Sequence, residues 1–114
     1  MGVWPVSPVN WNRERLLAQV KRTILQAEPG AEIVLYGSRC RGDATRESDW
    51  DFLVLVEGQA DDERVDRIRH RLYEIEWDCG EVLSCVVCNR QEWNSPLYRA
   101  MPFHREVERE GLNL

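Results

Sequence analysis

The chain lacks several features that would assign it to a whole class of proteins. No run approaches the roughly 18 apolar residues of a membrane-spanning helix, and the opening Met1-Gly2-Val3-Trp4-Pro5 has neither the basic start nor the apolar centre of a signal peptide. Basic residues are outnumbered, 15 against 20 acidic, and the net charge of −5 disfavours general binding to long nucleic acids. A chain of 114 residues has room for one hydrophobic core and not for two. We therefore expect a single cytoplasmic domain over residues 1–114, without general affinity for membranes or nucleic acids.

Cysteine is also scarce, with four residues at positions 40, 79, 85 and 88. Without a secretion signal, these are expected to be reduced thiols rather than a disulfide framework. The spacing Cys85-x-x-Cys88 also occurs in zinc sites, but such a site needs a second pair of ligands close by, and this pair stands inside an apolar run. Buried and inert thiols are the preferred interpretation.

Hydrophobic spacing divides the chain into alternating helices and strands. An amphipathic helix is expected from a cap at Asn10 or Asn12 to the turn at Pro29-Gly30. Short apolar runs at 33–36, 50–56 and 82–88 are typical of buried strands. Further helices are expected over 60–77 and 92–110, the last interrupted by Pro96 and Pro102. This order predicts an α/β fold in which helices cover a small mixed β-sheet.

Two aspartates stand at the head of the second expected strand. Asp49 and Asp51 are two residues apart, so their side chains project from the same face of the strand. Two carboxylates held close together beside a core repel one another and lose hydration, and a divalent cation is the usual compensation. Oxygen ligands of this kind favour Mg²⁺ or Mn²⁺, which also accept phosphate oxygens.

A glycine turn precedes the aspartates. Gly37-Ser38 follows the first strand and opens a short helix, so its backbone N–H groups and the Ser38 hydroxyl can face an anion. Arg39 and Arg41 add positive charge nearby, and Arg41, just before Gly42, is the better candidate for a phosphate oxygen. A phosphate turn beside a metal pair predicts a site for a nucleoside triphosphate held with its metal.

This arrangement resembles the signature of the DNA polymerase beta nucleotidyltransferase superfamily. The shared pattern is Gly37-Ser38, a gap of ten residues, Asp49-x-Asp51 and an apolar strand. Arg41-Gly42 and Ser48 before the first aspartate are similar to its minimal nucleotidyltransferase branch. The match is tight over residues 35–56 and looser elsewhere.

The resemblance implies a palm-like nucleotidyltransferase fold and an enzyme that transfers a nucleoside monophosphate, first of all AMP from ATP, to an acceptor hydroxyl. Asp49 and Asp51 would be the catalytic residues and the ligands of Mg²⁺ or Mn²⁺. Gly37, Ser38 and Arg41 would hold the phosphates as pyrophosphate leaves. Most of the catalysis in such a reaction is positioning and charge stabilisation.

The resemblance also implies a third carboxylate on the later strand, and the sequence departs from it there. Counting back from Glu92-Trp93 places the expected position at about Ser84, whose hydroxyl is no general base at neutral pH. Glu81 is expected on the opposite face of the strand unless a bulge intervenes, and Asp78 has the right parity but lies six residues away. Three interpretations stay open: Glu81 or Asp78 completes the site, a partner supplies the acid, or the domain binds nucleotide with little or no turnover.

The chain leaves few residues for binding an acceptor, which is therefore expected to come from outside. The resemblance implies a separately encoded HEPN-domain partner, a toxin that the nucleotidyltransferase modifies and silences as its antitoxin. The alternative is a module that binds nucleotide but is catalytically weak or inactive and inhibits the partner by contact. Trp4 and Trp11 could cover a subunit contact, so a homo-oligomer also stays open.

Overall fold

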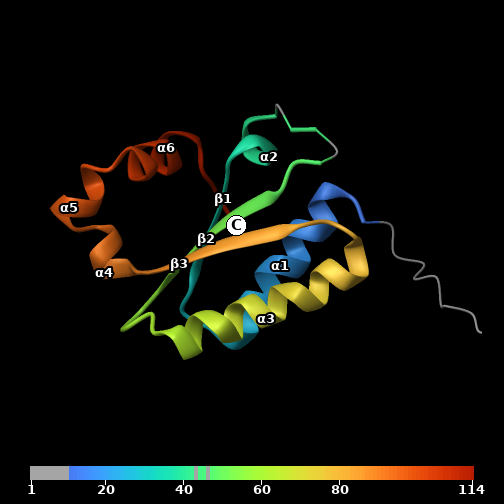
Figure 1. Ribbon diagram of the computed structural model, residues 1–114, viewed down its shortest axis with the longest axis horizontal. Helices are drawn as coiled ribbons and strands as arrows, with labels where there is room; N and C mark the ends of the chain where they lie inside the picture. Colours follow the sequence, from blue (N-terminus) through green and yellow to red (C-terminus); the bar gives the residue numbers. More distant parts are fainter. Residues whose placement is uncertain (1–10, 43, 46) are drawn as a thin grey trace, which may run out of the picture.

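One mixed sheet of four strands organises the molecule (Figure 1). The computed structural model describes residues 11–42, 44–45 and 47–114. The opening segment 1–5, which includes Trp4, and the candidate cap Asn10 lie outside this part. The elements in chain order are α1 (Arg13–Ala27), β1 (Glu32–Tyr36), α2 (Ser38–Arg41), β2 (Trp50–Val56), α3 (Asp62–Cys79), β3 (Leu83–Asn89), α4 (Arg90–Trp93), α5 (Pro96–Arg99), α6 (Pro102–Glu110) and β4 (Leu112–Asn113).

The strand order is β3-β2-β1-β4, so β2 is a central strand. It pairs antiparallel with β1 and parallel with β3, and β4 pairs antiparallel with β1. Every residue of β2 except Asp51 is buried, because the strand has helices over both faces of the sheet. That environment explains why the run from Phe52 to Val56 is apolar throughout instead of alternating.

The two faces of the sheet carry different helices. On one face, α1 and α3 pack side by side with a cluster that includes Leu16, Val20, Ile68 and Phe52. On the other, α4 to α6 lie over a smaller cluster that contains Leu53, Leu55, Trp93 and Val107. The predicted α/β fold, a small mixed sheet covered by helices, is thus confirmed. No helix in the described part of the chain is long and apolar enough to cross a membrane.

Caps and prolines set the helix boundaries. Asn12 and Asp61 accept hydrogen bonds from the first-turn amides of α1 and α3, which fixes where these helices begin. Pro96 and Pro102 each stand in the first turn of a short helix, where their missing N–H leaves no bond unmade. The single interrupted helix expected over 92–110 is therefore three separate helices, and β4 was not foreseen.

The four cysteines are free thiols. Cys85 belongs to the α1/α3 side of the sheet, whereas Cys88 packs with the cluster under α4 to α6. Their side chains project from opposite faces of β3, because three steps along a strand reverse the direction. The two thiols thus cannot converge on one ion from within this strand.

Candidate functional site

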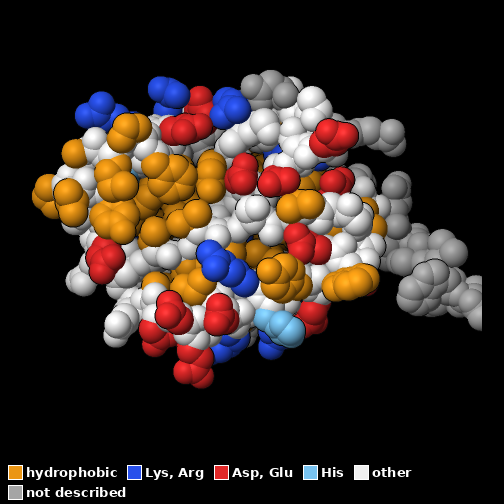
Figure 2. Space-filling model, viewed as in Figure 1, with side chains coloured by type: hydrophobic (Ala, Val, Ile, Leu, Met, Phe, Trp, Pro, Cys, Tyr) orange, Lys and Arg blue, Asp and Glu red, His pale blue; other side chains and the backbone are white. Residues whose placement is uncertain are grey.

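The candidate site lies where β2 begins. Asp51 is the second residue of β2 and pairs with Tyr36 on β1 and with Ser84 on β3. Asp49 precedes the strand by one residue and is exposed, whereas Asp51 is partly buried. Figure 2 shows acidic side chains gathered near the start of β2, beside an apolar area on the side of α4 to α6.

The glycine turn between β1 and α2 packs directly against the Asp51 carboxylate. Gly37 has φ 81° and ψ −163°, a backbone conformation that is essentially restricted to glycine. A Cβ atom at this position would lie 2.6 Å from Asp51 Oδ2. The turn that was predicted to hold phosphate and the aspartate that was predicted to hold metal are therefore in contact.

Burial and the neighbouring carboxylate raise the pKa of Asp51. Desolvation is the larger cause, the charge of Asp49 adds to it, and the charge of Arg41 opposes both. A buried carboxylate whose pKa is raised in this way is suited to a divalent cation, which favours its charged form. Burial, with a smaller effect of Asp51, also raises the pKa of Tyr36 to about 12, so its hydroxyl keeps its proton at neutral pH.

Arg39 is engaged on the opposite side of the sheet from Asp51. Its guanidinium lies 4.7 Å from the ring centroid of Trp50 and donates hydrogen bonds of 3.0 and 3.2 Å to the carbonyl of Ser48. A carboxylate oxygen of Glu81 is 3.6 Å away. These contacts anchor the chain just before the two aspartates.

Arg41, the other arginine of α2, reaches across to α6. Its Nη1 lies 3.3 Å from Glu106 Oε1 and 3.4 Å from Glu110 Oε2. It is still near enough to Asp51 for its charge to act on that carboxylate. The role of Arg41 as a phosphate ligand, which the sequence indicates, stays a prediction.

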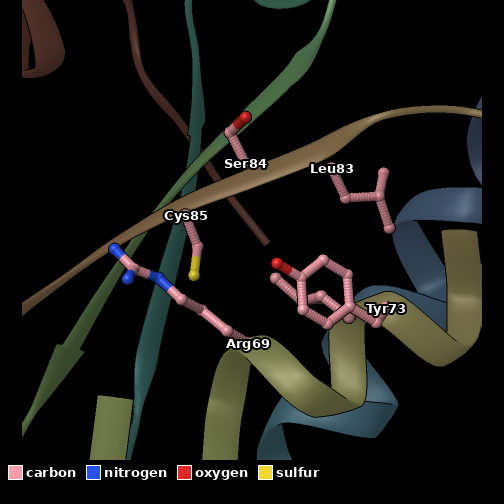
Figure 3. A pocket seen from close by; sticks show the side chains of 6 residues that line it. Arg69, Tyr73, Leu83, Ser84 and Cys85 are labelled. Atoms are coloured by element: carbon pink, nitrogen blue, oxygen red, sulfur yellow. The ribbon is translucent and has the colours of Figure 1, made fainter. Parts of the chain in front are cut away.

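Ser84 occupies the strand position beside Asp51. Figure 3 shows its side chain on the opposite side of β3 from Cys85, which points into a cavity of about 290 Å³ next to Arg69 and Tyr73. Glu81, which pairs with Arg39, faces the α1 side, and the exposed Asp78 is part of α3. The described residues contain no cluster of three or more His, Cys, Asp or Glu that could hold a metal. A divalent cation at the predicted pair, Asp49 and Asp51, would therefore find no third ligand of these types among the described residues.

Three residues near the site were not singled out as functional by the sequence. Tyr36 was treated as an ordinary strand residue, and Glu106 and Glu110 as part of a terminal helix. The spacing of four residues would place both glutamates on one side of a helix. Which neighbour they meet depends on the packing of α6 against α2, more than 60 residues away in the chain.

Comparisons with known proteins identify the family and the fold of the chain. The family model described as nucleotidyltransferase domain matches residues 17–107. Among solved structures, a toxin–antitoxin crystallised with AMP-PNP is similar with a TM-score of 0.59 and 18% identity, covering 90% of this chain and 72% of that one. A mutant of the toxin–antitoxin MntA–HpeT follows with a TM-score of 0.56 and 16% identity, and the same coverage of 90% and 72%. Among curated proteins, no sequence matches this chain.

Proposed function

Because the chain belongs to the nucleotidyltransferase domain family, we propose that it transfers a nucleoside monophosphate, AMP from ATP in the first instance, to a hydroxyl group of a second molecule. The observation that carries this proposal is the contact between the Gly37 turn and Asp51, where a Cβ would lie 2.6 Å from the carboxylate. This contact unites the two halves of the motif, a turn for phosphate and a carboxylate pair for a cation.

The residues of the turn would bind the triphosphate. The backbone N–H groups of the turn would donate to a phosphate, and the Ser38 hydroxyl would add a donor at the start of α2. Arg41 would pair with the outer phosphates, as guanidinium groups do with phosphate oxygens. Together these groups would hold the leaving pyrophosphate in place while the acceptor hydroxyl attacks the α-phosphate.

Asp49 and Asp51 would hold Mg²⁺ or Mn²⁺. When bound, the cation neutralises the negative charge that accumulates on the phosphates during the transfer. Asp51 is held in register between two neighbouring strands, so its carboxylate stays fixed against the turn. Asp49, outside the strand and more exposed, can adjust to the ligand.

The acceptor is proposed to be a hydroxyl on a partner protein, and the biological role that of an antitoxin. Two similar solved structures are toxin–antitoxin assemblies, one of them with a nucleotide analogue, which supports this role. A HEPN-domain toxin is the partner that the sequence resemblance implies. Since the donor is a nucleoside triphosphate, the cytoplasm is the compartment where the protein would act.

A second candidate function is nucleotide binding with little or no turnover. Ser84 beside Asp51 favours it, because among the described residues no third carboxylate joins Asp49 and Asp51 in a group that could hold a metal. In that case the protein would inhibit the toxin by contact, with the nucleotide as a ligand.

Incubation with Mg²⁺ and ATP labelled on the α-phosphate, with and without the HEPN-domain partner, separates the two functions. We expect label on the partner with the wild type, its loss with Asp51→Asn, and its retention with the control Asp66→Asn on the exposed face of α3. The Glu81→Gln and Asp78→Asn variants should also label the partner, because neither side chain lies beside the Asp51 carboxylate. Calorimetric binding of Mg-ATP without any labelling would favour the second function, and absence of both would refute the proposal.

A further inference from the structure

Helix α2, which carries the proposed phosphate ligands Ser38 and Arg41, is attached to α6 by side chains of both helices. Arg41 of α2 lies 3.3 Å from Glu106 and 3.4 Å from Glu110, which are one turn apart on α6. The Cys40 thiol donates a hydrogen bond of 2.8 Å to the backbone carbonyl of Glu110. The short helix that opens at Ser38 is therefore held against α6 on the side where the arginine points.

These ion pairs are open to exchange with a ligand. The side chain of Arg41 is 37% exposed, and those of Glu106 and Glu110 are 42% and 22% exposed. A pair that is this accessible contributes little to folding, and an incoming anion can reach the guanidinium without unpacking the core. The charge of Arg41 also acts on Asp51, so the arginine is within electrostatic reach of both the α6 carboxylates and this aspartate.

A triphosphate and the two glutamates need the same guanidinium. Phosphate oxygens are strong acceptors for arginine, and both glutamates bond to the same nitrogen, Arg41 Nη1, so a phosphate that takes this nitrogen weakens the bonds to the carboxylates. Glu106 and Glu110 would then face one another as like charges four residues apart, which is unfavourable on a helix. The charge of Glu106 is also felt at Tyr36, the strand neighbour of Asp51, where it contributes to the raised pKa of the tyrosine.

We propose that Glu106 and Glu110 compete with the triphosphate for Arg41 and thereby weaken nucleotide binding by the resting protein. The inference rests on the proposed function, in which Arg41 binds phosphate. Coupling between two sites is reciprocal. Nucleotide binding therefore loosens the contact between α2 and α6, and a basic surface of an acceptor protein that pairs with the two glutamates strengthens nucleotide binding.

Calorimetry with Mg-AMP-PNP tests the competition. The double variant Glu106→Gln/Glu110→Gln should bind about three- to ten-fold more tightly than the wild type, since exposed ion pairs each change an equilibrium by a factor of up to about five. Glu108→Gln is the matched control, because Glu108 is on the same helix and carries the same charge but pairs with His104. It should change the affinity by less than about two-fold.

The same pair of substitutions in an Arg41→Ala background shows whether the effect passes through the arginine. In that background, we expect the gain in affinity for Mg-AMP-PNP to shrink to the level of the Glu108→Gln control. Hydrogen exchange adds a readout that a purely structural role would not move. The amide of Gly111, bonded to the carbonyl of Val107 at the end of α6, should exchange faster when nucleotide binds to the wild type and not when it binds to the double variant.

Unchanged or weaker binding by the double variant, with the wild type binding normally, would overturn the competition and leave the proposed function intact. A gain that persists in the Arg41→Ala background would also overturn it, because the effect would then be one of general charge. If the wild type itself bound no nucleotide at millimolar concentration, the proposed function would fail and this inference with it. Thermal unfolding of each variant verifies that all of them are folded.

Discussion

Replacing Gly37 by alanine is the sharpest test of the site, because the structure predicts two separate costs. The backbone of Gly37, at φ 81° and ψ −163°, lies in a region that other residues avoid at a cost of about 1–3 kcal/mol. The added Cβ would also lie 2.6 Å from Asp51 Oδ2, closer than van der Waals contact allows. Asp51 cannot withdraw with its backbone, which is paired on both sides, so its carboxylate must rotate away from the turn.

Two other glycines separate these costs. Gly42 has φ 88° and ψ 6°, but no atom of the described residues lies within 4 Å of an added Cβ, so alanine there meets strain of about 1 kcal/mol without a collision with them. Gly30 has neither a positive φ nor a neighbour within 4 Å, so Gly30→Ala should be nearly neutral. The expected order of destabilisation is therefore Gly37, then Gly42, then Gly30.

Thermal unfolding and calorimetry with Mg-AMP-PNP measure the two consequences. A loss of 1–3 kcal/mol corresponds to a fall in Tm of roughly 4–13 °C for a domain of this size. Binding of the nucleotide by Gly37→Ala should fall at least about ten-fold below the wild type at temperatures where the variant is folded, and Gly30→Ala should bind normally. The reasoning would be refuted if Gly37→Ala lost no more stability than Gly42→Ala and kept its affinity for the nucleotide.

Three further predictions concern titration, an ion pair and the missing acid. Because the pKa of Asp51 is raised above 3.8 in the folded chain, its ionised form costs stability at neutral pH, so Asp51→Asn should increase the free energy of unfolding at pH 7 in metal-free buffer. This gain should vanish as the pH falls towards 3.8, which urea titrations across pH would show; equal stability of both proteins at all pH values would contradict it. Glu28 bonds to Arg64 at 2.6 Å and has a pKa lowered below 4.5 by that bond, so Glu28→Gln should destabilise the chain by about 1–3 kcal/mol at pH 7. The difference should diminish as the pH falls below 4.5, and a loss that is independent of pH would exclude the ion pair as its cause. Ser84→Asp adds a carboxylate beside Asp51, and labelling of the partner should rise by about ten-fold or more if the missing acid limits transfer, whereas an unchanged rate would show that a third acid at this corner is not limiting.

Much of the fold could be predicted because the deciding features are local. The run from Trp50 to Val56 is apolar enough to be a central strand wherever it is placed, and its observed bounds are those expected from the sequence. Asn12 caps its own helix through a hydrogen bond to Arg15, three residues away, which depends on nothing distant. The helix boundaries near the two prolines were harder to predict. Pro96 and Pro102 can either break one helix or begin two others, and only the packing of each segment decides between these outcomes.

The sequence by itself determined which candidate groups the site contains and their order along the chain, since the glycine turn and the two aspartates follow one another at fixed spacing. It also predicted both carboxylates on one face by strand alternation, although β2 begins only at Trp50, between the two aspartates. Only the tertiary structure decided that the turn touches Asp51, that Ser84 is its neighbour on β3, and that Glu106 and Glu110 reach Arg41. The physical reason is that strand register and helix docking are set by how the apolar faces of distant segments pack together. Short-range patterns carry almost no information about which polar groups that packing brings into contact.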